Sequence, residues 1–256
     1  MIPNHELSFQ MFSSCAAATL VEQITLLAHP GYSDVQPFCF GPPEDVAAPD
    51  DNVALLRAHG LTAKSGHFTL DLFADHLDLV AMIAAKFGMT LVVCPWINPG
   101  DRPATVAGWQ AFGVRMAAIK AQVAGPGLTY TCHNHDFEMI PRPDDSYPID
   151  PGDTVPFGPD PAWMAVGAAD PLPFLQKYHS RIAAVHVKAV AAPGTCLDEK
   201  GSADPGDGVM DWQTLWDASV RAGAPLMVVE HDLPSDWTRF ARRSIETMRR
   251  PGAQKA

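Results

Sequence analysis

Four titratable side chains crowd the stretch that follows one apolar run of the sequence. Residues 131–138 read Thr-Cys-His-Asn-His-Asp-Phe-Glu, so His133 and His135 are followed at once by Asp136 and Glu138. Two histidines two positions apart on an extended chain point to the same side. A single histidine is most often structural, but four such groups within six residues indicate proton transfer or metal binding.

A second polar pair ends the apolar run at 182–188. If this run is a strand, its period of two puts Val185 and Val187 on one face, towards helices, and His186 and Lys188 on the other. Buried charged groups need partners or a function. The alternative is that this strand end is open to water and the pair is merely solvated.

Two more acids follow apolar runs later in the chain. The run at 226–229 stops at Glu230, and Asp160 stands in a Gly-Pro-Asp-Pro turn, where it could equally be an ordinary turn residue or a helix cap. If Glu138, Asp160, His186 and Glu230 meet at one place, their three carboxylates repel one another unless a cation lies between them. Oxygen-rich ligation with one imidazole suits Mn²⁺ or Mg²⁺, with Zn²⁺ or Co²⁺ as alternatives.

The elements that must position these groups alternate along the chain. Eight short β-rich runs, all but the fifth followed by a helical pattern, in one chain of 256 residues predict a single α/β domain over residues 1–256, a (β/α)₈ TIM barrel, with a doubly wound open sheet as the rival. In either architecture the active site lies at the C-terminal ends of the strands. The predicted strands are Leu7–Phe12, Ser33–Pro37, Leu61–Ser65, Thr90–Cys94, Leu128–Cys132, Thr154–Phe157, Ile182–Val187 and Leu226–Val229. The predicted helices are Ala17–Ala28, Val46–His59, Leu72–Phe87, Thr105–Val123, Leu172–Tyr178, Trp212–Ala222 and Trp237–Arg249.

The fifth βα unit departs from this regularity. Residues 140–161 are rich in Pro, Asp and Gly, which interrupt helices. We therefore expect the fifth helix to be short or missing.

Composition narrows the classes of function. The net charge of −11 argues against nucleic acid or an anionic membrane as the main partner. The chain shows no signal peptide, no run long enough to span a membrane, and five cysteines without a CxxC pair, which together predict a cytoplasmic protein. Nucleotide-binding, Gly-x-Ser-x-Gly and His-Glu-x-x-His motifs are absent from the sequence. A homo-oligomer is compatible with all of this.

These stretches resemble the sugar phosphate isomerase/epimerase family, the xylose-isomerase-like barrels that include inosose dehydratases and the endonuclease IV branch. The likeness covers nearly the whole chain and rests on several motifs in a fixed order. In this sequence Ala189 stands where one of them, HxKD, has its acid. The motifs here are HNHDFE (133–138), like HNHDFEF; HVK (186–188), like HxKD; DGVMDW (207–212), like GxGxxDW; and VEHD (229–232), like VExD.

The resemblance implies a divalent metal held by Glu, Asp, His and Glu from four late strands. Carried over, these ligands become Glu138, Asp160, His186 and Glu230. We expect Glu138, Glu230, His133 and His135 to be the catalytic residues. Lys188, His67 and Trp96 are the expected substrate-binding residues, although His67 and Trp96 could simply line the top of the barrel.

The resemblance also implies the chemistry. We expect a metal-dependent isomerase or epimerase that removes a proton α to a carbonyl of a sugar or sugar derivative, through an enediolate. A lyase or dehydratase acting on a keto-sugar or inosose is one alternative. A non-catalytic sugar-binding barrel is another, motivated by Ala189 in the place of an acid and by the shortened fifth unit. DNA repair is disfavoured by the net negative charge. The expected partner is a small carbohydrate.

Overall fold

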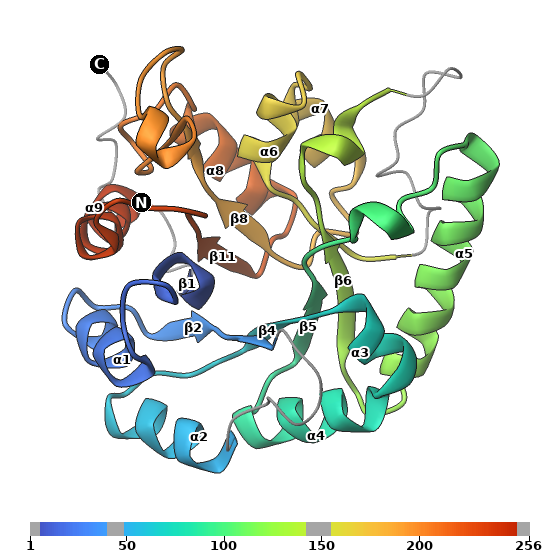
Figure 1. Cartoon of the computed structure of the whole chain (residues 1–256), viewed down its shortest axis with the longest axis horizontal. Coiled ribbons are helices and arrows are strands. Elements are labelled where there is room, and N and C mark those ends of the chain that lie inside the picture. Colours follow the sequence, from blue (N-terminus) through green and yellow to red (C-terminus); the bar gives the residue numbers. More distant parts are fainter. Residues whose placement is uncertain (1–5, 40–48, 142–154, 250–256) are drawn as a thin grey trace.

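Helices and strands alternate from one end of the chain to the other and form a ring (Figure 1). The computed structural model describes residues 6–39, 49–141 and 155–249. Its strands lie in the middle and its helices outside them. The ring strands are β1 (Glu6–Gln10), β2 (Asp34–Gln36), β3 (Phe38–Cys39), β4 (Ser65–Phe68), β5 (Leu91–Cys94), β6 (Thr129–His133), β7 (Phe157–Gly158), β8 (Val185–Val187) and β11 (Leu226–Val229).

Two parallel sheets share these strands, in the orders β2-β1-β11-β8 and β3-β4-β5-β6-β7. Parallel bridges join the sheets on both sides, from Asp34 to Thr62 and from Phe157 to Ile182. The ring is the α/β architecture of a (β/α)₈ barrel, as the sequence predicts. A short antiparallel pair, β9 (Ala189–Val190) and β10 (Ser202–Ala203), lies outside the ring order.

The helices form the outer layer. They begin where the sequence supplies side-chain caps: Thr19 accepts from the backbone N–H of Glu22, and Thr105 accepts from that of Gly108. Glycines that follow two of the helices adopt the left-handed conformation, with φ of 71° at Gly60 and 83° at Gly223. The helices are α1 (Leu20–Ala28), α2 (Pro49–Ala58), α3 (Leu70–Asp75), α4 (Leu77–Phe87), α5 (Val106–Val123), α6 (Pro161–Val166), α7 (Pro171–Lys177), α8 (Trp212–Arg221) and α9 (Trp237–Arg249).

Two hydrophobic layers support the ring. Inside the ring, side chains of β5, of β11 and of the residue before β8 pack together, among them Val93, Val228 and Ala184. A larger core lies between the strands and the helices and includes Val185 and Val187. The period-two reading of the seventh predicted strand is therefore confirmed, since its valines face the helices.

The structure corrects several predicted boundaries. The predicted helix 72–87 is broken into α3 and α4 at His76, whose φ of −138° and ψ of 41° are not helical. The predicted strand 61–65 is found later, as β4. Helix α6 was not predicted. Residues 142–154 lie outside the described residues, so the short or missing fifth helix stays a prediction. Among the described residues, no helix is both long and apolar enough to cross a membrane.

Candidate active site

Four strands of the ring deliver polar side chains to one end of the barrel. His133 is the last residue of β6, His186 lies within β8, and Glu230 follows β11 directly. Asp160 comes two residues after β7, where it caps α6 by accepting from the backbone N–H of Trp163 at 2.9 Å. All four side chains are buried. The strand order of a parallel ring thus brings residues 97 positions apart in the sequence to a common point.

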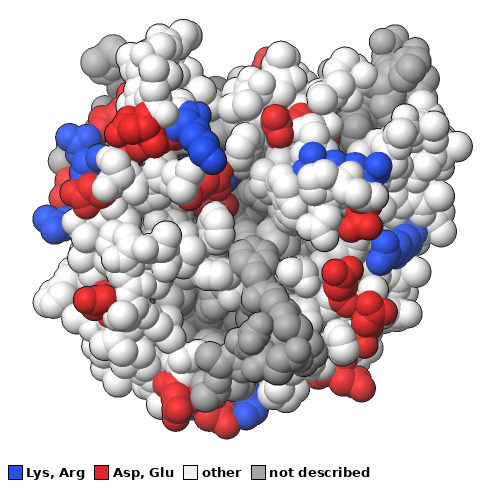
Figure 2. Space-filling model, in the orientation of Figure 1, with Lys and Arg blue, Asp and Glu red and all other residues white. Residues whose placement is uncertain are grey.

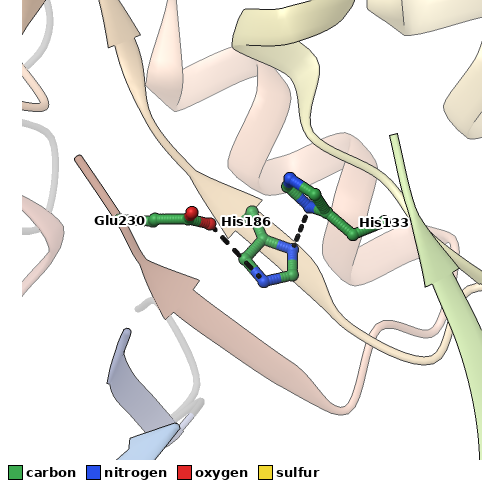
Figure 3. A group of neighbouring side chains, drawn as sticks. All are labelled: His133, His186 and Glu230. Carbon is green, nitrogen blue, oxygen red and sulfur yellow. Dashed lines mark hydrogen bonds and ion pairs between the residues drawn. The ribbon is translucent and has the colours of Figure 1, made fainter. Parts of the chain in front are cut away.

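Two imidazoles and one carboxylate form the centre of this group (Figure 3). His133 Nδ1 lies 3.0 Å from His186 Nδ1, and His186 Nε2 lies 3.7 Å from Glu230 Oε2. Ligand atoms of these three residues lie within 4.8 Å of one another. Asp160 adjoins them, with its Oδ2 at 3.9 Å from His133 Nε2. The four residues therefore offer two imidazoles and two carboxylates in one small volume.

Lys188 supplies the positive charge of the site. Its Nζ lies 2.8 Å from Asp232 Oδ1, 3.3 Å from Glu230 Oε1 and 3.6 Å from Asp160 Oδ2. Burial alone would lower the pKa of Lys188, but the three carboxylates outweigh it and raise the pKa. When all four groups are ionised, three carboxylates face one ammonium and leave two negative charges. A divalent cation carries the charge that balances them.

Burial dominates the protonation of the other groups. It raises the pKa of Glu230 to about 8 and that of Asp160 to about 6, although Lys188 beside them acts in the opposite direction. It lowers the pKa of His133 and of His186 well below the usual range, so both imidazoles are neutral at pH 7. A neutral imidazole keeps one nitrogen lone pair for a proton donor or a metal.

Three buried atoms of the group have no hydrogen-bond partner among the described residues. They are His133 Nε2, Asp160 Oδ2 and Glu230 Oε2. Buried polar atoms are nearly always satisfied, so three unpartnered nitrogen and oxygen atoms side by side require an explanation. Nitrogen and carboxylate oxygen are the usual ligands of Mn²⁺, Zn²⁺ and Co²⁺. The residues present therefore fit a bound divalent cation.

Glu138 is not part of the group formed by His133, His186 and Glu230, whose ligand atoms lie within 4.8 Å of one another. It belongs to a 3-10 turn, Asp136–Met139, that begins beyond the end of β6. The turn carries its carboxylate back to the chain, where Oε2 accepts from the backbone N–H of His135 at 2.7 Å. Burial raises the pKa of Glu138 to about 8. His133, at the strand end itself, belongs to the close group with His186 and Glu230, while the metal-binding role of Glu138 stays a prediction.

A cavity of about 440 Å³ opens above the cluster. On the face drawn in Figure 2 the surface is hollowed near its centre, and charged side chains lie mainly around the hollow. Aromatic rings line much of the cavity, in contrast to the polar cluster. The lining includes Phe12, His67, Trp96, His133, His135, Asp136, Trp163, Glu230 and Asp232.

Two of the three predicted substrate residues, His67 and Trp96, line this cavity, and the third, Lys188, lines a neighbouring pocket. Trp96 is 40% exposed, and its ring lies edge-on to that of His135 with 4.7 Å between centroids. The Nδ1 of His135 is buried without a hydrogen-bond partner among the described residues. His67 is buried at the base, 5.4 Å from the His186 ring. Lys188 is turned towards the carboxylates, so its ammonium is already engaged.

Sequence reasoning missed two glutamines beneath the cluster. Gln10, at the end of β1, and Gln36, at the end of β2, are fully buried, and Gln36 Oε1 lies 3.0 Å from His186 Nε2. Amides do not titrate and form no recognised motif. A signal was present, because Gln10 shares the inward face of its strand with Ser8, and polar residues in the middle of apolar strands need partners.

Solved structures of similar shape identify the architecture. A sugar phosphate isomerase/epimerase from Parabacteroides distasonis superposes with a TM-score of 0.81, 16% identity and coverage of 98% of each chain. A xylose isomerase domain protein from Alicyclobacillus acidocaldarius gives a TM-score of 0.68 at 16% identity, over 95% of this chain and 96% of that one. The fold is the xylose isomerase-like TIM barrel.

Two further solved structures of similar shape are a dehydratase and a zinc-bound protein. A probable 3-DHS dehydratase, AsbF, from Bacillus anthracis matches with a TM-score of 0.73 and 10% identity, over 95% of this chain and 98% of that one. The IolI protein, described with a bound zinc atom, matches with a TM-score of 0.70 and 14% identity over 94% of each chain. No family model matches the sequence, and no curated protein does.

Proposed function

We propose that this barrel is a metal-dependent isomerase or epimerase of a sugar or sugar derivative, working by proton abstraction α to a carbonyl. The observation that carries the proposal is the set of buried, unpartnered ligand atoms on His133, Asp160 and Glu230 beside the His186 ring. These four residues would hold the cation. When bound, a divalent cation stabilises negative charge that develops on substrate oxygens.

Glu230 is the residue best placed to move the proton. It lines the cavity, its Oε2 has no hydrogen-bond partner among the described residues, and burial raises its pKa to about 8, close to neutral pH. The carboxylate takes the proton from the carbon next to the carbonyl, and the C–H electron pair moves towards the carbonyl oxygen. Return of the proton to the neighbouring carbon gives an isomer, and return to the opposite face gives an epimer.

His135 is the second group that can carry a proton at this cavity. Burial and the positive charge of Lys188 lower its pKa to about 3, so it is a neutral acceptor or donor at pH 7. Its ring lies between those of Trp96 and Trp163, at 4.7 and 5.1 Å. Such aromatic walls suit the apolar faces of a sugar ring. Glu138 takes no part in this scheme because its carboxylate binds the chain's own backbone.

A lyase or dehydratase remains the second candidate because it begins with the same proton abstraction. Its support is the similarity to AsbF, whose description is that of a dehydratase. One of the two grounds for the non-catalytic barrel is weakened. Lys188 keeps three carboxylate partners without an acid at position 189, so Ala189 does not leave that ammonium unpaired.

One experiment tests the proposal and separates these candidates. Purified protein is stripped with a chelator, reloaded with Mn²⁺, Mg²⁺, Zn²⁺ or Co²⁺, and incubated in D₂O with a panel of keto- and aldo-sugars. An isomerase or epimerase exchanges the α-proton and yields a sugar of the same mass apart from deuterium, whereas a dehydratase also releases water. Absence of exchange with every metal and sugar would support the binding barrel.

A further inference from the structure

A chain of buried amides lies beneath the two histidines and connects them to the backbone. Its first member is the backbone N–H of Phe12, which donates to Gln10 Oε1 at 3.0 Å. A backbone N–H can only donate, so this bond fixes which end of the Gln10 amide is the oxygen. The Gln10 Nε2 group must then be the donor in its own contacts.

Gln10 in turn orients Gln36. Gln10 Nε2 lies 2.6 Å from Gln36 Oε1, and Gln36 Nε2 lies 2.8 Å from Ser65 Oγ. If the Gln36 amide were reversed, two NH₂ groups would face each other at 2.6 Å. The oxygen of Gln36 therefore points towards His186, and the side chains of Gln10, Gln36 and Ser65 are fully buried.

The next contact decides where His186 carries its proton. Gln36 Oε1 lies 3.0 Å from His186 Nε2 and can only accept. We infer that Gln36 is a positioning residue that holds the proton of His186 on Nε2 and so keeps the Nδ1 lone pair for a metal ion. This inference rests on the proposed metal site and adds a residue that sets its chemistry.

The consequence reaches His133. Its Nδ1 lies 3.0 Å from the His186 Nδ1 lone pair, and its Nε2 lies 3.9 Å from Asp160 Oδ2. If neutral His133 has its proton on Nδ1, its Nε2 lone pair faces a carboxylate. If the proton is on Nε2, two lone pairs face each other at 3.0 Å. In either state two hydrogen-bond acceptors face each other without a proton between them. A cation bound between them would relieve this repulsion.

The first measurement determines the tautomer of His186 in protein without metal. In ¹⁵N-resolved NMR spectra, His186 signals are assigned by their loss in His186→Asn. We expect a protonated, pyrrole-type Nε2 and an unprotonated, pyridine-type Nδ1 in the native chain. A proton on Nδ1 in that spectrum overturns the inference with no variant needed. This measurement is independent of whether the protein turns over a sugar.

Metal affinity gives the second reading, by titration calorimetry with Zn²⁺ and Mn²⁺. Gln36→Leu removes the acceptor and should lower the affinity about 10- to 100-fold and mix the two tautomers. Gln36→Glu keeps an acceptor for Nε2–H and should restore both the tautomer and the affinity. Unchanged affinity and tautomer in Gln36→Leu would reject the role of Gln36.

Gln23→Leu is the matched control. Gln23 is another buried glutamine with two hydrogen bonds, from Ser14 Oγ and to the Ala18 carbonyl, and it lies in α1 outside the site. Its replacement should reduce stability without changing the His186 tautomer or the metal affinity. If the native chain binds neither metal, the proposed function fails, while the NMR result still decides the tautomer.

Discussion

The Nζ atom of Lys188 lies 2.8 Å from Oδ1 of Asp232, so an ammonium just past β8 is held by a carboxylate just past β11. The same ammonium faces Glu230 and Asp160. Among the described residues, the Lys188 ammonium is therefore the positive charge that faces these three carboxylates. Its competition with a bound metal gives the first prediction.

Replacement of Lys188 by Met should make stability depend strongly on metal. Without the ammonium, buried carboxylates repel one another, and loss of one partner of a buried ion pair costs about 3–5 kcal/mol. Addition of Mn²⁺ should then raise the Tm more in Lys188→Met than in the native chain, because a ligand stabilises the state that binds it. Thermal melts with and without metal measure this.

Lys86→Met is the control for that variant. Lys86 forms an exposed pair with Asp50 at 2.6 Å, and exposed pairs contribute little to stability. Its Tm should stay near that of the native chain with or without Mn²⁺. An equal metal response in the native chain, Lys86→Met and Lys188→Met would contradict the placement of the metal among the carboxylates.

Glu230→Gln should abolish α-proton exchange while the barrel stays folded. The amide keeps the size of the side chain but cannot accept the substrate proton, and Glu230 lies at the mouth and outside the packed interior layer. Exchange into D₂O with Mn²⁺-loaded protein measures the loss, and circular dichroism checks the fold. Full exchange by Glu230→Gln would remove Glu230 from the role of base.

His133→Ala and Glu138→Gln should distinguish the two candidates for the metal ligand at or just after the end of β6. His133 lies beside His186, whereas Glu138 binds the His135 backbone. We expect His133→Ala, like His186→Ala, to weaken Zn²⁺ binding by at least about tenfold, and Glu138→Gln to leave it unchanged. Calorimetry decides between them; a larger loss in Glu138→Gln would return Glu138 to the metal set.

Glu138 should instead affect how stability changes with pH. Its pKa is about 8 in the folded chain, above the usual 4.5, because burial favours the neutral form. Between these values the folded state binds more protons than the unfolded state, so this group makes stability fall as pH rises. Each pKa unit corresponds to about 1.4 kcal/mol.

The variant Glu138→Gln removes that titration. Relative to the native chain, it should gain stability progressively from pH 5 to pH 8, by a few kcal/mol in total. Urea unfolding at several pH values gives the comparison. A difference between the two proteins that is constant over this range would show that Glu138 is not a buried, titrating carboxyl.

Regular strands could be predicted from the sequence, and with them most of the site. The run 226–229 coincides with β11, and alternation placed His186 and Lys188 on the inward face of β8. Glu230 follows from the same alternation. Burial patterns of period two are strong enough here to give the direction of each side chain.

The rest depends on geometry that local patterns do not contain. Glu138 is five residues past the end of β6, where a turn and not a strand decides its direction. Helix 72–87 looks continuous because its apolar residues keep helical spacing on both sides of His76. The positioning role proposed for Gln36 depends on its contacts with Gln10 and His186. These residues are distant in sequence and meet only in the folded ring.

The two bridges that join the sheets have a mechanical consequence. One sheet carries Gln36, His186 and Glu230, while the other carries His133 and leads to Asp160. Between the sheets, the contacts are the isolated bridges Asp34–Thr62 and Phe157–Ile182 together with backbone hydrogen bonds such as His67 N–H to the Pro37 carbonyl and His186 N–H to the Pro159 carbonyl. The polar cluster thus spans the boundary between the two sheets. A cation bound by residues of both sheets would also cross-link these two halves of the barrel.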